Sequence, residues 1–237
     1  EIIEEGANVK VQLLGRDVQP ADLVVIGSHC VGLDYLLGKL QDRGYRTKFL
    51  AVGSTAGLDA AQRGECDLAG LHLLDAPSGQ YNTPFLTDEL ELIQGYGRRQ
   101  GLLFRPDDQR FSDRSACEAI ELAKSDLGCV MVNRNQGSGT RILIDQLLEG
   151  VQPSGYAVQT RNHNAVAAAV AQSRADWGIA IRSVAERAEL GFLPITDEQF
   201  DFLVPKSRAN KPAVRELRDL LVDADVRKTL RDLGFVL

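Results

Sequence analysis

The chain has 237 residues, of which 44% are hydrophobic, so it is long enough to bury the core of one large domain or of two smaller lobes. Its formal net charge is -6 and its sequence pI is about 5.2, which argues against nonspecific adhesion to nucleic acids or membranes, because such surfaces need surplus Lys and Arg. A small anion can still be bound where backbone N–H groups and one or two Arg converge.

Short apolar runs alternate with longer segments of helical period, a pattern typical of a mostly parallel sheet wrapped by helices. In the first part of the chain we expect strands at residues 21–26, 46–52 and 67–71, with helices at 32–41 and 55–63. A loop rich in Pro, Ser, Gly and Asn follows at 76–84. Residues 90–104 are strand-forming and are predicted to cross from one lobe to another.

The same pattern then starts again. We expect helices at 115–124, 139–148 and 164–173 and strands at 129–133, 156–160 and 177–181, with a return crossing at 202–205. Two helices, 212–222 and 225–232, complete the chain, and Pro212 suits a first helical turn. The predicted division is lobe 1 at 20–104 plus 203–237 and lobe 2 at 105–202, preceded by a linker at 1–19.

One internal similarity supports two related lobes. Asp67 and Asp176 each follow a predicted helix and precede a predicted strand. Turn chemistry is the plainer explanation for both aspartates, because Asp is favoured where a chain reverses.

The spacing of the cysteines and the absence of long apolar runs bear on the cellular compartment of the chain. No pair of the four cysteines has CxxC spacing, so we expect reduced core residues rather than a zinc or redox site. No apolar run approaches the roughly 18 residues of a membrane span, and no charged-then-apolar leader is present. We therefore expect a cytoplasmic chain without a membrane partner. Because it begins with Glu1 rather than Met, we also expect a mature or excised fragment.

In four places a predicted strand ends and a small or polar cluster opens the next helix. Helix N-termini carry unsatisfied N–H groups and the positive end of the helix dipole. The carboxyl ends of the strands in an open α/β sheet share one edge, so two facing lobes would direct all four clusters into one anion-binding cleft. The alternative for any single cluster is a simple N-cap. The clusters are Gly27-Ser28-His29, Gly53-Ser54-Thr55, Gly137-Ser138-Gly139-Thr140 and Asn162-His163-Asn164.

The third cluster carries the sharpest signal. Gly137 and Gly139 let the backbone approach a ligand closely. Ser138 and Thr140 add hydroxyl donors, and Arg134, at the end of the preceding strand, adds a charge-assisted fork. The GxxxxGK[ST] spacing of a phosphate-binding Walker loop is absent, and so is the GxSxG elbow of a hydrolase. We therefore expect binding rather than catalysis.

The three histidines and one loop are weaker candidates. His29 follows the first strand and His163 opens a helix, so each is a candidate ligand contact. His72, at the end of the third strand, is a candidate for a cleft contact or for a structural hydrogen bond. Their local spacing supports no metal site. Tyr81 and Asn82 are candidates to close over a ligand, the alternative being an ordinary surface loop.

The pattern R-x-x-x-S-G-T formed by Arg134, Ser138, Gly139 and Thr140 resembles the oxyanion loop of type II periplasmic-binding-protein folds, including phosphate and tungstate binders. The wider run, about residues 20 to 205, is more similar to the cytoplasmic PBP-like domain fused to molybdopterin-biosynthesis proteins or to helix-turn-helix DNA-binding domains. The matching stretches are 25–29, 52–54, 64–75, 133–141 and 163–170. The resemblance implies a two-lobe α/β fold in which each lobe is a mostly parallel sheet flanked by helices.

This resemblance also implies a function. The cleft would close around molybdate, tungstate or a similar oxyanion, with no other cofactor, as the effector domain of a transcriptional regulator. DNA would be bound only through a missing N-terminal domain, and a homodimer is a candidate assembly. Alternatives are the receptor of an anion importer, the C-terminal domain of a molybdopterin-biosynthesis enzyme, and an organic-anion binder. The expected ligand contacts are Ser28, His29, Ser54, Thr55, His72, Arg134, Ser138, Gly139, Thr140 and His163.

One departure from the family pattern concerns the choice of anion. Phosphate binders of this fold usually carry an Asp two residues after the Arg, where it accepts a proton from phosphate. This chain has Gln136 there. Without that acceptor, a fully ionised dianion such as molybdate, tungstate or sulfate is favoured over protonated phosphate. Whether Arg141, on the first turn of its helix, faces the cleft or forms a surface salt bridge is left open.

Overall fold

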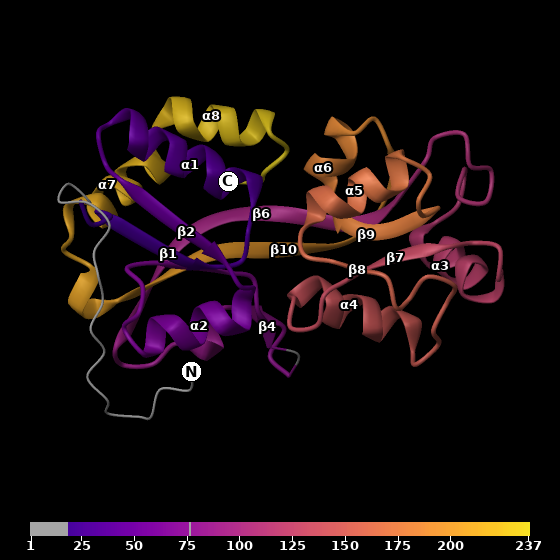
Figure 1. Ribbon diagram of the computed structural model, residues 1–237, viewed down its shortest axis with the longest axis horizontal. Coiled ribbons are helices and arrows are strands. Elements are labelled where there is room, and N and C mark those ends of the chain that lie inside the picture. Colours follow the sequence, from indigo (N-terminus) through magenta and orange to yellow (C-terminus); the bar gives the residue numbers. More distant parts are fainter. Residues whose placement is uncertain (1–18, 76) are drawn as a thin grey trace, which may run out of the picture.

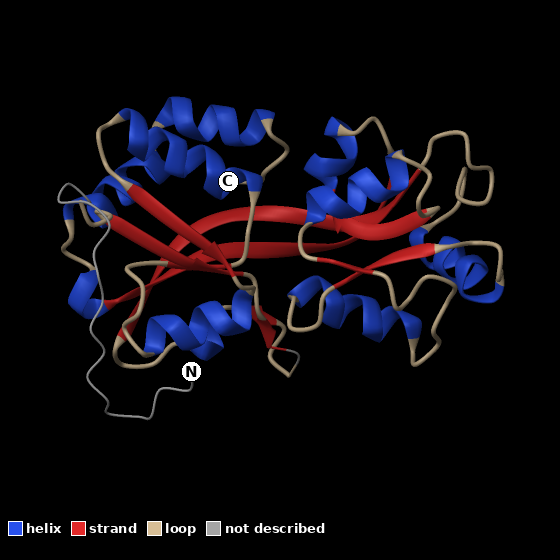
Figure 2. Cartoon of the chain, in the orientation of Figure 1, coloured by secondary structure: helices blue, strands red, loops and turns tan. Residues whose placement is uncertain are grey.

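The computed structural model describes residues 19–75 and 77–237. Two lobes lie side by side, and the long strands β6 and β10 run through both of them (Figure 1). Helices cover both faces of the strands in each lobe (Figure 2). The linker expected at residues 1–19 lies outside the described residues except for its last one.

The elements of lobe 1 come from both ends of the chain. They are β1 (Leu23–Gly27), α1 (Val31–Asp42), β2 (Thr47–Ala51), α2 (Ser54–Gln62), β3 (Ala69–Leu71), β4 (Leu74–Asp75), β5 (Gln80–Tyr81), the 3₁₀ turns Thr83–Phe85 and Lys206–Arg208, α7 (Pro212–Val222) and α8 (Ala224–Asp232). Those of lobe 2 are α3 (Ala116–Ser125), β7 (Met131–Arg134), α4 (Gly139–Leu148), β8 (Gln159–Thr160), α5 (His163–Ala171), β9 (Trp177–Ile181) and α6 (Arg182–Arg187). The connecting strands are β6 (Leu90–Phe104) and β10 (Gly191–Pro205).

The sheet confirms the expected α/β architecture. Six strands pair in the order β3-β10-β6-β9-β7-β8, and β1 pairs with β2 in parallel. β1 also continues onto β3, because Ile26 N donates to Leu68 O at 3.0 Å and Ser28 N donates to Gly70 O at 2.8 Å. β7 is parallel to both β8 and β9, whereas β6 and β10 are antiparallel. Each lobe is thus a parallel unit, and an antiparallel ribbon joins the two.

The sequence predicted the bounds of one connecting strand correctly and those of the other only in part. β6 has the predicted bounds, but β10 begins at Gly191, so the predicted crossing at 202–205 is only its end. The strand pattern before residue 202 is obscured in the sequence by Pro194 and by three acidic residues, Asp197, Glu198 and Asp201. The register shifts between Pro194 and Thr196 and again between Phe200 and Phe202, which accommodates a proline within a paired strand. The lobe boundaries at 104/105 and 202/203 stay a prediction, since both strands continue through the two lobes.

Three further elements differ from expectation. The predicted strand 156–160 is reduced to Gln159–Thr160, because the chain turns through Gly155, whose φ is +84°. The hairpin β4–β5 lies within and beside the predicted loop, and the six-residue α6 was not predicted. Cys30, Cys66 and Cys129 are buried thiols as expected, but the free Cys117 is exposed on α3.

The aspartates that suggested an internal repeat have equivalent roles in the two lobes. An Asp67 carboxylate oxygen accepts from Val24 N at 2.9 Å, and one of Asp176 accepts from Val130 N at 2.8 Å. Each aspartate therefore ties the start of its strand to the strand alongside. Their turn chemistry is structural, as the plainer explanation held, and it is repeated in both lobes.

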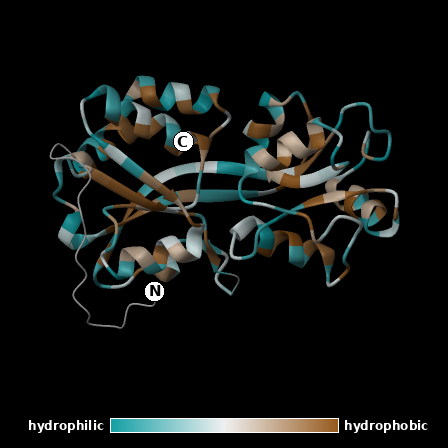
Figure 3. Ribbon diagram, viewed as in Figure 1, coloured by the Kyte–Doolittle hydropathy of each residue, from teal (hydrophilic) through white to brown (hydrophobic). Residues whose placement is uncertain are grey.

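Apolar side chains fill the lobes, and polar ones gather where the lobes meet. One core cluster extends from Leu33 and Phe202 in lobe 1 to Val166 and Val184 in lobe 2, and another surrounds Trp177 in lobe 2. The central parts of β6 and β10 are hydrophilic (Figure 3). Arg98 and Glu198 lie there, and both are buried. Within residues 19–75 and 77–237, no helix has the length and apolar character needed to span a membrane.

Candidate functional site

A cavity of about 390 Å³ lies between the lobes. Residues from all four strand-to-helix junctions line it. Lobe 1 contributes the ends of β1 and β2, and lobe 2 contributes the end of β7 and the segment before α5. The lining residues are Ser28, His29, Ala51, Val52, Gly53, Arg134, Asn135, Ser138, Arg161 and Asn162.

The junctions reach the cavity because each helix begins immediately beyond a strand. Ser138 is the N-cap of α4, and its hydroxyl accepts from Arg141 N at 3.2 Å. Asn162 caps α5 in the same way, accepting from Ala165 N at 2.8 Å. Ser138 and Asn162 therefore cap their helices and also line the cavity. The helix N-termini carry partial positive charge at the cavity wall.

Arg134 is the main charged group of the cavity. It ends β7 and is only 4% exposed. Its Nη1 lies 3.1 Å from His163 Nδ1 and its Nη2 donates to Arg161 O at 3.4 Å. Burial, with the charge of Arg98, lowers the pKa of Arg134 to about 10 despite the opposing charge of Glu198. Among the described residues Arg134 has no ion-pair partner, and its Nε has no hydrogen-bond acceptor.

The lining has positive charge and no compensating carboxylate. Arg161 adds a second guanidinium, and none of the described lining residues is Asp or Glu. Gln136 is exposed and does not line the cavity. Asn135, which does line it, has a buried Oδ1 without a partner in the described part of the chain. Since buried charges in proteins are normally paired, this cavity is suited to an anion.

A buried polar network lies behind Ser28. His72 Nε2 is 3.0 Å from Ser28 Oγ, and His72 Nδ1 is 2.9 Å from Glu198 Oε2. Arg98 forms an ion pair with Glu198, and Gln100 donates to the same carboxylate. Burial raises the pKa of Glu198, but Arg98 and His72 outweigh it and lower the pKa to about 2. The sequence patterns did not point to Arg98, Gln100 or Glu198, because polar and charged residues in a strand normally indicate a solvent-facing side.

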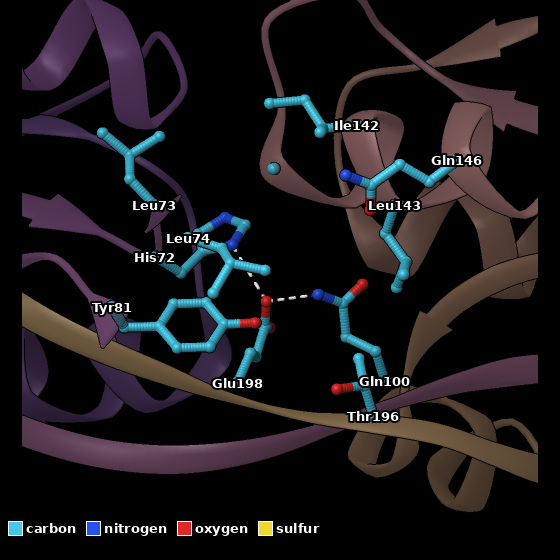
Figure 4. A pocket seen from close by; sticks show the side chains of 11 residues that line it. His72, Leu73, Leu74, Tyr81, Gln100, Ile142, Leu143, Gln146, Thr196 and Glu198 are labelled. Atoms are coloured by element: carbon cyan, nitrogen blue, oxygen red, sulfur yellow. Dashed lines mark hydrogen bonds and ion pairs between the residues drawn. The ribbon is translucent and has the colours of Figure 1, made fainter. Parts of the chain in front are cut away.

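A second cavity, of about 100 Å³, lies on the other side of His72 (Figure 4). Glu198, Gln100 and the Tyr81 hydroxyl gather at one end of it, whereas leucines and Ile142, with Gln146 and Thr196, form the rest of the wall. Gly139 of α4 also lines it. His72 therefore separates a polar, anion-suited cavity from a smaller and more apolar one.

The ten expected contacts occupy four kinds of position. Ser28, His29, Arg134 and Ser138 line the larger cavity, and His72 and Gly139 line the smaller one. Ser54, Thr140 and His163 are buried but line neither cavity, whereas Thr55 is exposed. Ser54 Oγ accepts from His72 N at 3.2 Å, which makes it a support of His72. Thr140 Oγ1 has no hydrogen-bond partner in residues 19–75 and 77–237.

The sequence did not decide the roles of Arg141, Asn82 and Tyr81. Arg141 Nε donates to Asp145 at 2.8 Å and Nη1 donates to Arg134 O at 3.1 Å, so it braces the Arg134 backbone and does not line the cavity. Asn82 is buried and donates to Asp201 at 2.9 Å. Tyr81 lines the smaller cavity and not the larger one. No cluster of His, Cys, Asp and Glu with metal-ligand geometry occurs among the described residues.

The lobes touch on both sides of the cavity. A Cβ placed on Gly139 would lie 3.0 Å from the Nδ1 and carbonyl oxygen of His72, so a glycine is needed for this approach. A Cβ on Gly53 would lie 3.6 Å from Gly137 O of the opposite lobe. The arrangement is therefore closed, and groups from both lobes can contact one enclosed ligand.

A family comparison covers most of the chain. A family model described as "PBP superfamily domain" matches residues 37–222. The uncharacterized protein YvgK of Bacillus subtilis (strain 168) is 30% identical over 98% of this chain and 76% of its own length.

Solved structures share the fold at low identity. A putative phosphate ABC transporter substrate-binding protein from Clostridium perfringens, with bound phosphate, aligns with a TM-score of 0.69 at 13% identity, over 90% of this chain and 98% of that one. A tungstate ABC transporter structure from Geobacter sulfurreducens gives 0.62 at 18% identity, over 89% and 97%. The effector-binding domain of QuiR in complex with shikimate gives 0.58 at 14% identity, over 83% and 93%. These likenesses show a type II periplasmic-binding-protein fold.

Proposed function

The chain belongs to the PBP superfamily, and we propose that within it this domain closes around a small oxyanion, with molybdate or tungstate favoured, and binds without catalysing a reaction. The observation that carries the proposal is Arg134, a nearly fully buried guanidinium with no ion-pair partner in the described residues. A bound anion would supply the missing negative charge.

The lining of the larger cavity also favours a fully ionised dianion over a protonated phosphate. A protonated phosphate needs a strong acceptor for its proton, and no described lining residue is a carboxylate. A fully ionised dianion has no such need and benefits from the helix N-termini and from Arg134. The cavity is large for a four-oxygen ion, so we expect water to share it.

For the biological role we favour the effector domain of a transcriptional regulator, acting in the cytoplasm and reaching DNA through a further domain. QuiR, whose effector-binding domain has the same fold, supports this proposal. The tungstate and phosphate transport proteins favour a second candidate, the receptor of an anion importer. The full reading frame distinguishes the two, because a regulator predicts a DNA-binding domain and a receptor predicts a signal peptide.

Isothermal titration calorimetry with tungstate, molybdate, sulfate and phosphate tests the binding proposal. We expect saturable binding of one or more dianions, and at least about a hundredfold weaker binding by Arg134→Ala, because charge-assisted hydrogen bonds in a buried site are among the strongest. Arg63→Ala is the matched control, since Arg63 pairs with Glu65 on the surface and lines no cavity. Absence of binding for all four anions, or equal binding by Arg134→Ala, would contradict the proposal.

A further inference from the structure

A chain of short polar contacts, made of hydrogen bonds and ion pairs, runs from the larger cavity into the protein interior. Ser28, which lines the cavity, lies 3.0 Å from His72 Nε2, and His72 Nδ1 lies 2.9 Å from Glu198 Oε2. Gln100 donates to the same carboxylate oxygen, and Arg98 forms an ion pair with the other one. Figure 4 shows the inner part of this relay, where His72 and Gln100 point at Glu198.

In the ligand-free chain the protons of this relay have one consistent arrangement. Glu198 is ionised and lies 2.9 Å from His72 Nδ1, so its charge favours the tautomer that carries the ring hydrogen on Nδ1. Burial lowers the pKa of His72 although Glu198 raises it, so the ring is neutral near pH 7 and its Nε2 is an acceptor. The Ser28 hydroxyl then donates to Nε2 and presents only lone pairs to the cavity.

That arrangement is unfavourable for a fully ionised oxyanion. An anionic oxygen beside Ser28 needs a donor, and lone pairs facing it would repel it. Ser28 can turn its hydrogen to the ligand only if His72 Nε2 becomes a donor to Ser28 Oγ. His72 must then carry hydrogens on both ring nitrogens.

We propose that a fully ionised oxyanion enters this cavity together with one proton, which is bound by His72 and sensed by the ligand through Ser28. The inference rests on the proposed oxyanion function and adds the protonation state of the site. It makes Ser28 and His72 the residues that decide whether the site accepts a dianion or a ligand that donates a hydrogen bond.

The charges around His72 agree with uptake of a single proton. Glu198 of β10 raises the pKa of His72, and Arg98 of β6, the ion-pair partner of Glu198, opposes this effect only in part. Arg134 of β7 and the N-terminus of α4 at Gly139 oppose protonation of His72 while the cavity lacks an anion. A dianion reverses this balance, because its negative charge offsets the charges of Arg134 and Arg161 and favours a proton on His72.

Two other histidines lie near enough to be considered. His163 of α5 is a neutral acceptor for Arg134, since burial and then the charge of Arg134 lower its pKa well below the usual value. Its protonation would place two positive groups in contact. His29 lines the cavity but pairs with Asp34 at 2.8 Å on the surface side. His72 is the histidine that contacts Ser28, at 3.0 Å, so it is the one whose proton Ser28 can relay to the ligand.

Calorimetric titration with sulfate, which stays fully ionised near neutral pH, tests the inference. Titrations in two buffers with different ionisation enthalpies give the number of protons bound with the ligand. We expect about one proton per sulfate at pH 7, and an affinity that weakens about tenfold for each unit of rising pH while His72 is protonated only in the complex.

Variants assign the proton and separate the two proposals. We expect His72→Gln to bind more weakly with no proton uptake, and His29→Gln to retain uptake of about one proton. Ser28→Ala leaves the buried Arg98–Glu198 ion pair intact and should lower proton uptake. It replaces His72→Gln as the test variant if His72→Gln does not fold. Sulfate binding without proton uptake in the parent, or uptake lost in His29→Gln, overturns this inference alone. Absence of any anion binding overturns the oxyanion function and this inference together.

Discussion

Arg134 is placed where its charge lowers the stability of the ligand-free fold. Its guanidinium is buried, and hydrogen bonds to His163 and to Arg161 O replace its hydration only in part. Removing a buried charge from water costs several kcal/mol unless a counter-charge is present. Residues that bind ligands commonly lower stability in this way.

We therefore expect Arg134→Met to raise the free energy of unfolding of the ligand-free chain by roughly 1 kcal/mol, because a flexible apolar side chain fills the space without an unpaired charge. Urea unfolding measures it. With tungstate at about 100 times its dissociation constant the parent should gain about 2.7 kcal/mol and the variant nothing. A variant less stable than the parent in the absence of ligand would refute this reading of Arg134.

Glu198 makes stability depend on acid pH. Its pKa is lowered from 4.5 to about 2, because Arg98 and His72 outweigh the effect of burial. A lowered pKa stabilises the fold above the unfolded-state value, and the stabilisation is lost as pH falls from about 4.5 towards 2. We expect the urea midpoint of the parent to fall more steeply over this range than that of Glu198→Gln/Arg98→Met, in which both charges are absent. Parallel pH profiles would count against the buried pair.

At the residue scale the sequence predicted the cavity wall better than the groups behind it. Ser28, Arg134 and Ser138 lie at strand ends, and strand ends of a parallel sheet share an edge, so their approach follows from the topology. Their role in binding stays a prediction. Glu198 and Arg98 lie in the middle of long strands, where alternating charged residues normally face water. Only the pairing of β6 with β10 buries them together.

At the element scale, α4 is the helix through which lobe 2 reaches lobe 1. Its first residue, Gly139, lies against His72, and its N-cap, Ser138, lines the larger cavity. The contact between α4 and His72 therefore forms only when the two lobes close. A side chain at Gly139 would keep the lobes apart.

We expect Gly139→Ala to weaken oxyanion binding several-fold and Gly139→Val to weaken it further, because the added carbons meet His72 before the lobes close. Calorimetry gives the affinities, and circular dichroism checks that the helices persist. Gly38→Ala in α1 is the control. Nothing lies within 4 Å of the added carbon there, and alanine should stabilise that helix by about 0.5–1 kcal/mol without changing affinity. Equal affinity of Gly139→Val and parent would argue that binding does not require this contact.

Most elements could be located from apolar periodicity, and the exceptions have physical causes. β6 and α7 were predicted with their observed bounds, since each has a clear pattern and α7 starts at Pro212. β10 was recognised only at its end, because Pro194 and two register shifts interrupt the alternation on which strand prediction depends. β8 is too short to have a period at all.

At the scale of the whole molecule, the connection between the lobes allows one motion to create the site. β6 and β10 are the two strands that run through both lobes (Figure 1). The central stretch of this ribbon is largely hydrophilic (Figure 3) and carries glycines, together with the buried Tyr96 and Phe200. A ligand that contacts both lobes binds the closed state better and shifts the population towards it.

We expect small-angle X-ray scattering to show a smaller radius of gyration with saturating tungstate than without it, because the open state is populated when Arg134 lacks a counter-charge. Arg134→Ala should show no change on addition of tungstate. A parent with the same radius in both conditions would indicate a preformed closed site, and closure would then not be part of the mechanism.

The anomalous difference map of a crystal grown with tungstate locates the bound ion, because tungsten identifies its own position. We expect one strong peak within hydrogen-bonding distance of the Arg134 guanidinium, enclosed by Ser28, Ser138 and the N-termini of the facing helices. Peaks found only on the outer surface, with the cavity between the lobes filled by water alone, would contradict the proposed oxyanion site.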